Sequence, residues 1–117
     1  MGDLSEHFSR HEFACKCGCG RDTIDAETLK LCEIVREFVG YPVTVASGYR
    51  CEIHNRRVGG GTRSQHLYGR AADLVVTDPA SVYEMLCKRF PDEFGFGRYG
   101  TFVHVDTRSN GPARWYG

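Results

Sequence analysis

The sequence predicts an α+β fold, a single compact domain over residues 1–117 with helices packed against a small antiparallel sheet. Two segments repeat apolar residues at the three- and four-residue spacing of an amphipathic helix. Three short β-branched runs alternate apolar with other side chains, as half-buried strands do. A length of 117 residues without an internal repeat or a linker suits one domain.

The first elements precede residue 25. Ser9 and Glu12 have the spacing of a capping box, and Phe8 and Phe13 flank it as a hydrophobic staple, so we expect a helix start there. A turn rich in cysteine and glycine follows.

A longer helix is expected from about Asp25 to Gly40, which is a natural helix stop. Its predicted apolar stripe consists of Leu29, Cys32, Val35 and Val39. A short strand containing Val43 and Val45 follows and ends at Ser47-Gly48.

The second half begins with residues 51–69, which are too rich in glycine and arginine for regular core and predict a long functional loop. A strand over 71–76 follows. Asp78 and Pro79 then supply an N-cap and a first-turn proline for a helix. Its apolar stripe is expected to be Val82, Met85, Leu86 and Phe90. Residues 95–100 read as a strand or a turn, and 101–108 as the last strand.

Composition excludes several classes of protein. Fifteen basic and fifteen acidic residues give no net charge, so nothing points to nucleic acid or to an anionic membrane surface as partner. No apolar run reaches membrane-spanning length. The segment MGDLSEHFSR lacks the pattern of a secretory signal, which predicts cytoplasmic synthesis. We expect a monomer.

The six cysteines leave two interpretations open. Cys15, Cys17 and Cys19 lie in CKCGCG, whereas Cys32, Cys51 and Cys87 are scattered. The favoured interpretation is a glycine-rich turn with reduced, partly buried thiols. The alternative is a metal or disulfide clip, although the spacing differs from the C-x₂-C of structural zinc sites.

Three possible metal ligands stand in different elements. His66 ends the long loop, Asp73 opens a strand and His104 lies within another strand. If those strands are neighbours, two imidazoles and a carboxylate converge and leave a coordination position open, as in catalytic zinc sites. The alternative for His104 is a strand histidine that faces solvent.

The residues around these ligands resemble the zinc D-Ala-D-Ala carboxypeptidase family. The segments are SGYRCEIHNRRVGGGTRSQHLYGRAADLVV and GFGRYGTFVHVDTR, with the motifs S-G-Y-R, S-x-H-x-x-G-x-A-x-D and V-H-V-D. That family includes peptidoglycan endopeptidases and is related in fold to the zinc domain of Hedgehog proteins. This chain resembles its small single-domain branch, found in bacteriophages and bacteria.

The resemblance implies one zinc ion per chain, bound by His66, Asp73 and His104. It also implies that Arg50, from S-G-Y-R, holds the scissile carbonyl oxygen or the substrate carboxylate, which suits a fixed guanidinium.

The general base is an open question. Several relatives place a carboxylate general base three residues before the last histidine ligand, where this chain has Thr101. Asp106 shares a strand face with His104 and is the alternative, either as base or as a carboxylate that orients a ligand. Glu93 is a poorer candidate. For substrate contacts the candidates are Ser64, Gln65 and Tyr68, with Tyr49, Tyr99 and Trp115 as further aromatics that could line a cleft.

The leading hypothesis is a zinc metallopeptidase that cleaves an amide bond in peptidoglycan stem peptides or crosslinks, as a D,D-carboxypeptidase or an endolysin-like endopeptidase. Access to the cell wall would then require phage lysis, non-classical export or a place on a virion. One alternative is a catalytically silent zinc-binding module of the same fold. A non-haem iron oxygenase, which also uses two histidines and a carboxylate, is the least favoured.

Overall fold

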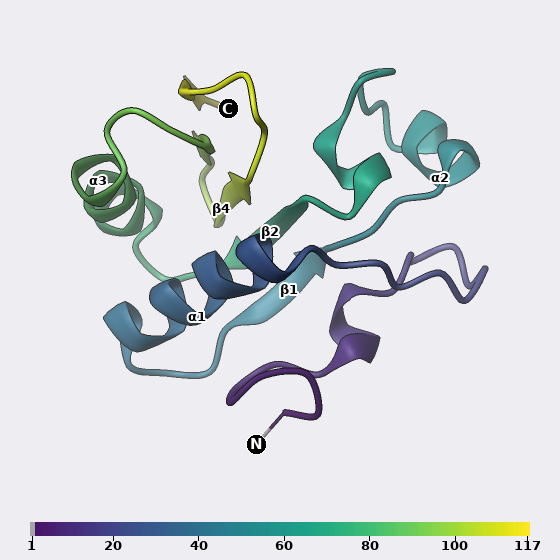
Figure 1. The fold of residues 1–117 in the computed structure, drawn as a ribbon, viewed down its shortest axis with the longest axis horizontal. Coiled ribbons are helices and arrows are strands. Elements are labelled where there is room, and N and C mark those ends of the chain that lie inside the picture. The colour runs from purple at the N-terminus through teal and green to yellow at the C-terminus, as the bar shows by residue number, and fades with distance from the viewer. Residues whose placement is uncertain (1) are drawn as a thin grey trace.

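The computed structural model describes residues 2–117 and contains a five-stranded sheet with strand order β1-β2-β4-β3-β5 (Figure 1). The predicted α+β class is confirmed. None of the helices within residues 2–117 is long and apolar enough to cross a membrane. The strands are β1 (Thr44–Ser47), β2 (Ala71–Val75), β3 (Gly95–Arg98), β4 (Phe102–Asp106) and β5 (Ala113–Tyr116). The helices are α1 (Ala26–Val39), α2 (Glu52–Arg57) and α3 (Pro79–Arg89), with 3-10 turns η1 (Arg10–Phe13) and η2 (Gln65–Tyr68).

The sheet is mixed, so the expectation of an antiparallel sheet is wrong at one edge. The pairs β1·β2, β2·β4 and β3·β4 are antiparallel, but β5 pairs with β3 in parallel. After β4 the chain reverses direction and passes to the far side of β3. Because β3 is antiparallel to β4, the returning strand β5 is parallel to β3. A Cβ on Gly97 of β3 would collide with the indole of Trp115 in β5, so glycine makes this pairing possible.

Helix α1 has the predicted ends. The Asp25 side chain accepts a hydrogen bond from the Glu27 N–H (3.1 Å), and Gly40 ends the helix in the left-handed region at φ 74°. The buried face differs from the predicted stripe, because Leu29 and Val39 are only partly buried. The fully packed side chains are Thr28, Leu31, Cys32 and Val35.

Helix α3 also begins as predicted, since Asp78 accepts from the Ser81 N–H (3.2 Å) and Pro79 follows. The helix start expected near Ser9 is one 3-10 turn, η1, with the Ser9 N–H donating to Glu12 Oε2 (2.7 Å). The predicted staple is present as well. The rings of Phe8 and Phe13 lie 5.8 Å apart and are buried.

The two faces of the central strands have different surroundings. Ala72 and Leu74 of β2, with Val103 and Val105 of β4, are buried in the core, where α1 and α3 contact these strands. Side chains alternate across a strand, so Asp73, His104 and Asp106 face the other side. On that side the loop 51–69 contains α2 and η2, which sequence patterns did not predict.

Candidate metal centre

His66, Asp73 and His104 converge on one face of the sheet. Asp73 of β2 is the direct partner of His104 in β4, and its Oδ1 lies 2.9 Å from His104 Nδ1. The turn η2 brings His66 Nε2 within 3.4 Å of Asp73 Oδ2. All three residues are buried, and one donor atom from each lies within 4.8 Å of the other two. The structure thus brings together the three predicted ligands.

Each imidazole has its outer nitrogen bound to an oxygen acceptor. His66 Nδ1 lies 2.7 Å from the carbonyl oxygen of Gly48, and His104 Nε2 lies 2.8 Å from Asp106 Oδ2. With the outer nitrogens held in this way, the inner nitrogens, His66 Nε2 and His104 Nδ1, are the ones that would bind a metal ion. Metal-binding histidines usually have this arrangement, so the donor set fits a divalent metal ion.

The Asp73 carboxylate and the His104 imidazole shift each other's pKa. Burial alone would raise the pKa of Asp73, but its contacts with His104 and His66 outweigh burial and hold that pKa well below the ordinary value. Burial would lower the pKa of His104, but its contacts with Asp106 and Asp73 raise it instead. Asp73 is therefore ionised, as a metal ligand must be.

Gly69 sets the path of the chain between His66 and Asp73. Its φ is +69°, and a Cβ there would lie 2.8 Å from Thr23 Cγ2 and from the Thr23 carbonyl oxygen. The Gly69 carbonyl accepts from the Asp25 N–H (2.7 Å), which ties this corner to the start of α1. Only glycine suits this combination of left-handed backbone and close approach.

Arg50 lies beside the ligands and is held on three sides. Its Nε donates to Ser47 Oγ (3.1 Å), its Nη1 to Asn55 Oδ1 (3.3 Å) and its Nη2 to Asp73 Oδ2 (3.4 Å). Asn55 is buried and donates in turn to the Gly61 carbonyl (2.9 Å). Sequence reasoning missed Asn55, because it lies in α2, which was not predicted.

Asp106 lies behind His104 and is fully buried. Arg108, which sequence reasoning also missed, donates from Nε to Asp106 Oδ1 (2.9 Å) and from Nη2 to Oδ2 (2.7 Å). Burial would raise the pKa of Asp106, but the contacts with Arg108 and His104 hold it well below its usual range. Both carboxylate oxygens therefore have partners. The signal for Arg108 was its place two residues after Asp106 in the strand expected over 101–108, although the observed strand β4 ends at Asp106.

A hollow of about 300 Å³ opens over the three ligands. Three guanidinium groups line it, from Arg50, Arg63 and Arg108, and Asp73 is the only carboxylate in its lining within residues 2–117. The side chains are thus suited to an anionic or carbonyl-bearing ligand.

Polar and aromatic groups complete the walls of this hollow. Ser64 and Gln65 line it, and Gln65 Oε1 is buried without a hydrogen-bond partner among residues 2–117. The Trp115 ring lies 5.1 Å from the His104 ring, and its Nε1 donates to the Tyr99 hydroxyl (2.9 Å).

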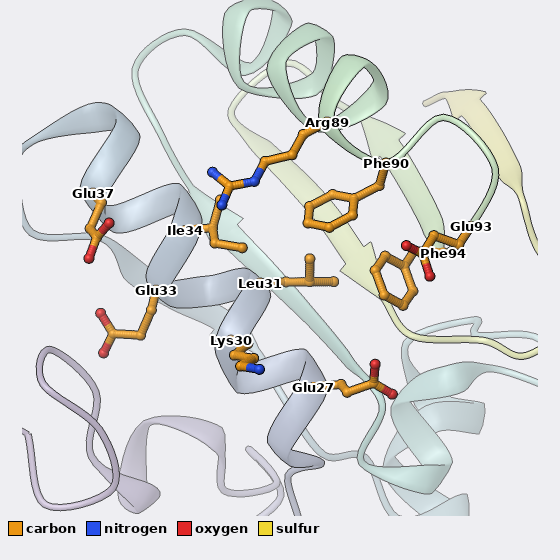
Figure 2. A pocket seen from close by; sticks show the side chains of 10 residues that line it. All are labelled: Glu27, Lys30, Leu31, Glu33, Ile34, Glu37, Arg89, Phe90, Glu93 and Phe94. Carbon is orange, nitrogen blue, oxygen red and sulfur yellow. The ribbon is translucent and has the colours of Figure 1, made fainter.

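Four candidates lie apart from this hollow. Tyr68 is exposed and lines a different depression together with Tyr49. Thr101 is exposed and precedes β4. Glu93 lies on a larger hollow of about 500 Å³ between α1 and the end of α3, where Figure 2 shows it beside Phe94. None of the four lines the hollow over the ligands.

This chain is similar to a known protein family and to a curated relative. A family model described as Peptidase M15 matches residues 6–106. A zinc D-Ala-D-Ala carboxypeptidase from Streptomyces albus G is 52% identical to this chain over 33 residues. Those residues are 28% of this chain and 13% of the length of that relative.

Proposed function

The chain belongs to the peptidase M15 family, and we propose that it is a zinc-dependent peptidase that hydrolyses an amide bond in peptidoglycan stem peptides or their crosslinks. The observation that carries this proposal is the convergence of His66 Nε2, Asp73 and His104 Nδ1 beneath a hollow that Arg50 lines. The similarity to a zinc D-Ala-D-Ala carboxypeptidase supports the metal and the class of substrate.

The three ligands would hold one zinc ion per chain. A bound zinc ion supplies Lewis-acid chemistry: it activates water as a nucleophile and polarises a carbonyl group. The Gly48 carbonyl and Asp106 hold the outer nitrogens of His66 and His104, so the inner nitrogens are the atoms that would bind the ion.

The arginines would bind and orient the substrate. Arg50, held by Ser47 and Asn55, presents its guanidinium to the carbonyl oxygen that becomes negative during hydrolysis, or to a substrate carboxylate. Arg63 adds positive charge to the same hollow, which Arg108 also lines while it is paired with Asp106. This charge favours a stem peptide that ends in a free carboxylate, as a carboxypeptidase requires. Ser64 and Gln65 would bind the peptide backbone.

Asp106 is best explained as a positioning residue. It contacts His104 on the side away from Asp73, and Arg108 occupies the rest of its oxygens. In that position it fixes the His104 ring and is poorly placed to accept a proton from a nucleophile in the hollow.

A catalytically silent zinc-binding module is the second candidate. The observation that favours it is that, within residues 2–117, no carboxylate except Asp73 lines the hollow. Relatives with a carboxylate at the position of Thr101 would have a proton acceptor that this chain lacks.

The proposed place of action is the cell wall, reached after phage lysis, by non-classical export or on a virion. The proposed acting form is a monomer.

Digestion of purified peptidoglycan, followed by mass spectrometry of the released fragments, tests the proposal. We expect the zinc-loaded chain to release free D-alanine or separated stem peptides, and the His66→Ala variant to release neither. Wild-type protein that binds zinc tightly but releases no fragment would refute the peptidase and favour the silent module.

A further inference from the structure

Four cysteines gather at a second place, outside the hollow described above. Cys15 Sγ lies 3.3 Å from Cys17 Sγ and 3.8 Å from Cys51 Sγ, and the Sγ atoms of Cys17 and Cys51 are 3.6 Å apart. Cys19 completes a group whose four sulfur atoms all lie within 4.8 Å of one another. We call these four residues the cysteine cluster.

The fold brings the cysteine cluster together from segments that are 36 residues apart in sequence. In Figure 1 the N-terminal loop after η1 reaches toward the start of α2, where Cys51 is the N-cap. The loop closes on itself through the Cys15 N–H, which donates to the Arg21 carbonyl (2.7 Å). Gly18 and Gly20 have φ of 86° and 84°, a backbone that lets CKCGCG wind around one point.

The sulfur separations match ligands of a single tetrahedral ion. Four thiolates at about 2.3 Å from zinc lie about 3.8 Å from one another. The three distances above are close to that value, and all exceed the bond length of a disulfide, about 2.05 Å. An iron–sulfur cluster would need room for several metal and sulfide atoms between the thiolates, which this spacing does not leave.

Backbone donors already point at two of the sulfurs. The Cys51 N–H lies 3.4 Å from Cys15 Sγ, and the His54 N–H in the first turn of α2 lies 3.4 Å from Cys51 Sγ. N–H groups aimed at sulfur stabilise thiolate, the form that binds metal. Cys17 and Cys19 are exposed, and their thiols would be prone to oxidation without a ligand role.

We propose that the cysteine cluster binds a second zinc ion in a closed, structural site. Four thiolates fill a tetrahedral coordination shell and leave no open position, unlike the His66, Asp73 and His104 site. The ion would tie the N-terminal loop to the start of α2. Because Cys51 directly follows Arg50, it would also fix the segment that presents the Arg50 guanidinium.

Metal analysis of matched variants tests the proposal. The full-length wild type, His66→Ala, Cys17→Ser and Cys87→Ser would be purified under reducing conditions, and zinc measured per chain. Cys87 lies outside the cysteine cluster and is partly buried, so its variant is the matched control. We expect about two zinc ions in wild type and Cys87→Ser, and about one in each of the other two variants.

Cobalt substitution assigns each ion to its site. Cobalt in the cysteine cluster gives intense thiolate-to-metal charge-transfer absorption in the near ultraviolet, whereas cobalt on nitrogen and oxygen ligands does not. This absorption should persist in His66→Ala and be lost or strongly shifted in Cys17→Ser. The failure of one site is therefore distinguishable from failure of the other.

Thiol protection in the wild type covers the case in which Cys17→Ser does not fold. Cys15, Cys17, Cys19 and Cys51 should resist alkylation until a chelator is added, while Cys87 reacts equally with and without chelator. A wild type with one zinc that His66→Ala loses entirely would overturn the proposal. Disulfides within the cysteine cluster, or alkylation that is indifferent to chelator, would overturn it too.

Discussion

Replacing Asp106 by asparagine separates the two roles that this carboxylate could have. Asparagine keeps the shape but exchanges one oxygen for an NH₂ group. Oδ1 accepts from the N–H and Nε of Arg108, and Oδ2 faces His104 Nε2 and Arg108 Nη2. In either orientation the new NH₂ group therefore meets a donor. The fully buried residue has no water to compensate.

The expected size of the effect follows from these contacts. Breaking a buried ion pair costs about 3–5 kcal/mol, and we expect the lower end because the Arg108 side chain is 23% exposed and can turn toward water. Loss of the group that orients a metal-binding histidine lowers metal affinity by about 10–100-fold. Loss of a general base would instead lower kcat by about 10²–10⁴-fold with metal affinity unchanged.

Three measurements on Asp106→Asn give the answer: urea unfolding, zinc affinity by competition with a chromophoric chelator, and kcat at saturating zinc. We expect weaker zinc binding and lower stability, with kcat within a few-fold of wild type once zinc is saturating. Asp22→Asn, at a partly exposed residue that lies beside Arg10, is the control. Unchanged zinc affinity with a kcat loss of about 10²-fold or more would refute the positioning role and identify Asp106 as the base.

Three further predictions concern other parts of the chain. Arg50→Lys keeps the charge but loses the contacts that the planar guanidinium makes with Ser47 and Asn55. We expect kcat/KM for peptidoglycan fragments to fall by about 10²-fold with zinc content unchanged. Full activity would contradict the role given to Arg50. Burial would raise the pKa of Glu33, but donors from Ser5 and His7 outweigh it and lower that pKa below the unfolded value of about 4.3. The folded state then binds fewer protons than the unfolded state. Glu33 therefore stabilises the fold fully above about pH 4.3, and this contribution is lost as the pH falls through the lower pKa of the folded state. Urea unfolding of Glu33→Gln between neutral and acidic pH should show a shallower acid loss than wild type, and an identical slope would refute this. Leu86→Ala, at a fully buried core position, should lower the free energy of unfolding by about 2–5 kcal/mol. The zinc content at saturating metal should not change. A smaller loss of stability would mean that neighbouring side chains fill the cavity left by Leu86.

Features specified by neighbouring residues could be predicted from sequence. Asp25 and Gly40 bound α1 because a side-chain cap and a left-handed glycine act within one turn. Asp78 and Pro79 begin α3 for the same reason. These signals depend on local chemistry and need no knowledge of the tertiary fold.

Features that depend on distant partners could not be predicted in this way. The strand β5 contains Arg114 and lacks clean alternation, and it exists because β3 offers Gly97 as a place for the Trp115 ring. Cys51 stands alone in sequence, and only the fold places it beside Cys15. The convergence of Asp73 with His104 is predicted only on the condition that their two strands are neighbours, and the sequence alone does not give the strand order.

Because Asp73 pairs directly with His104, metal binding at these ligands would depend on the register between β2 and β4. Side chains alternate between faces, so a slip of one residue between β2 and β4 would turn His104 toward α1 and α3 and bring a valine to the ligand face. Misregistered chains would therefore bind no metal at these ligands. During refolding, the rate at which metal is taken up at this site would report when the two central strands find their correct alignment.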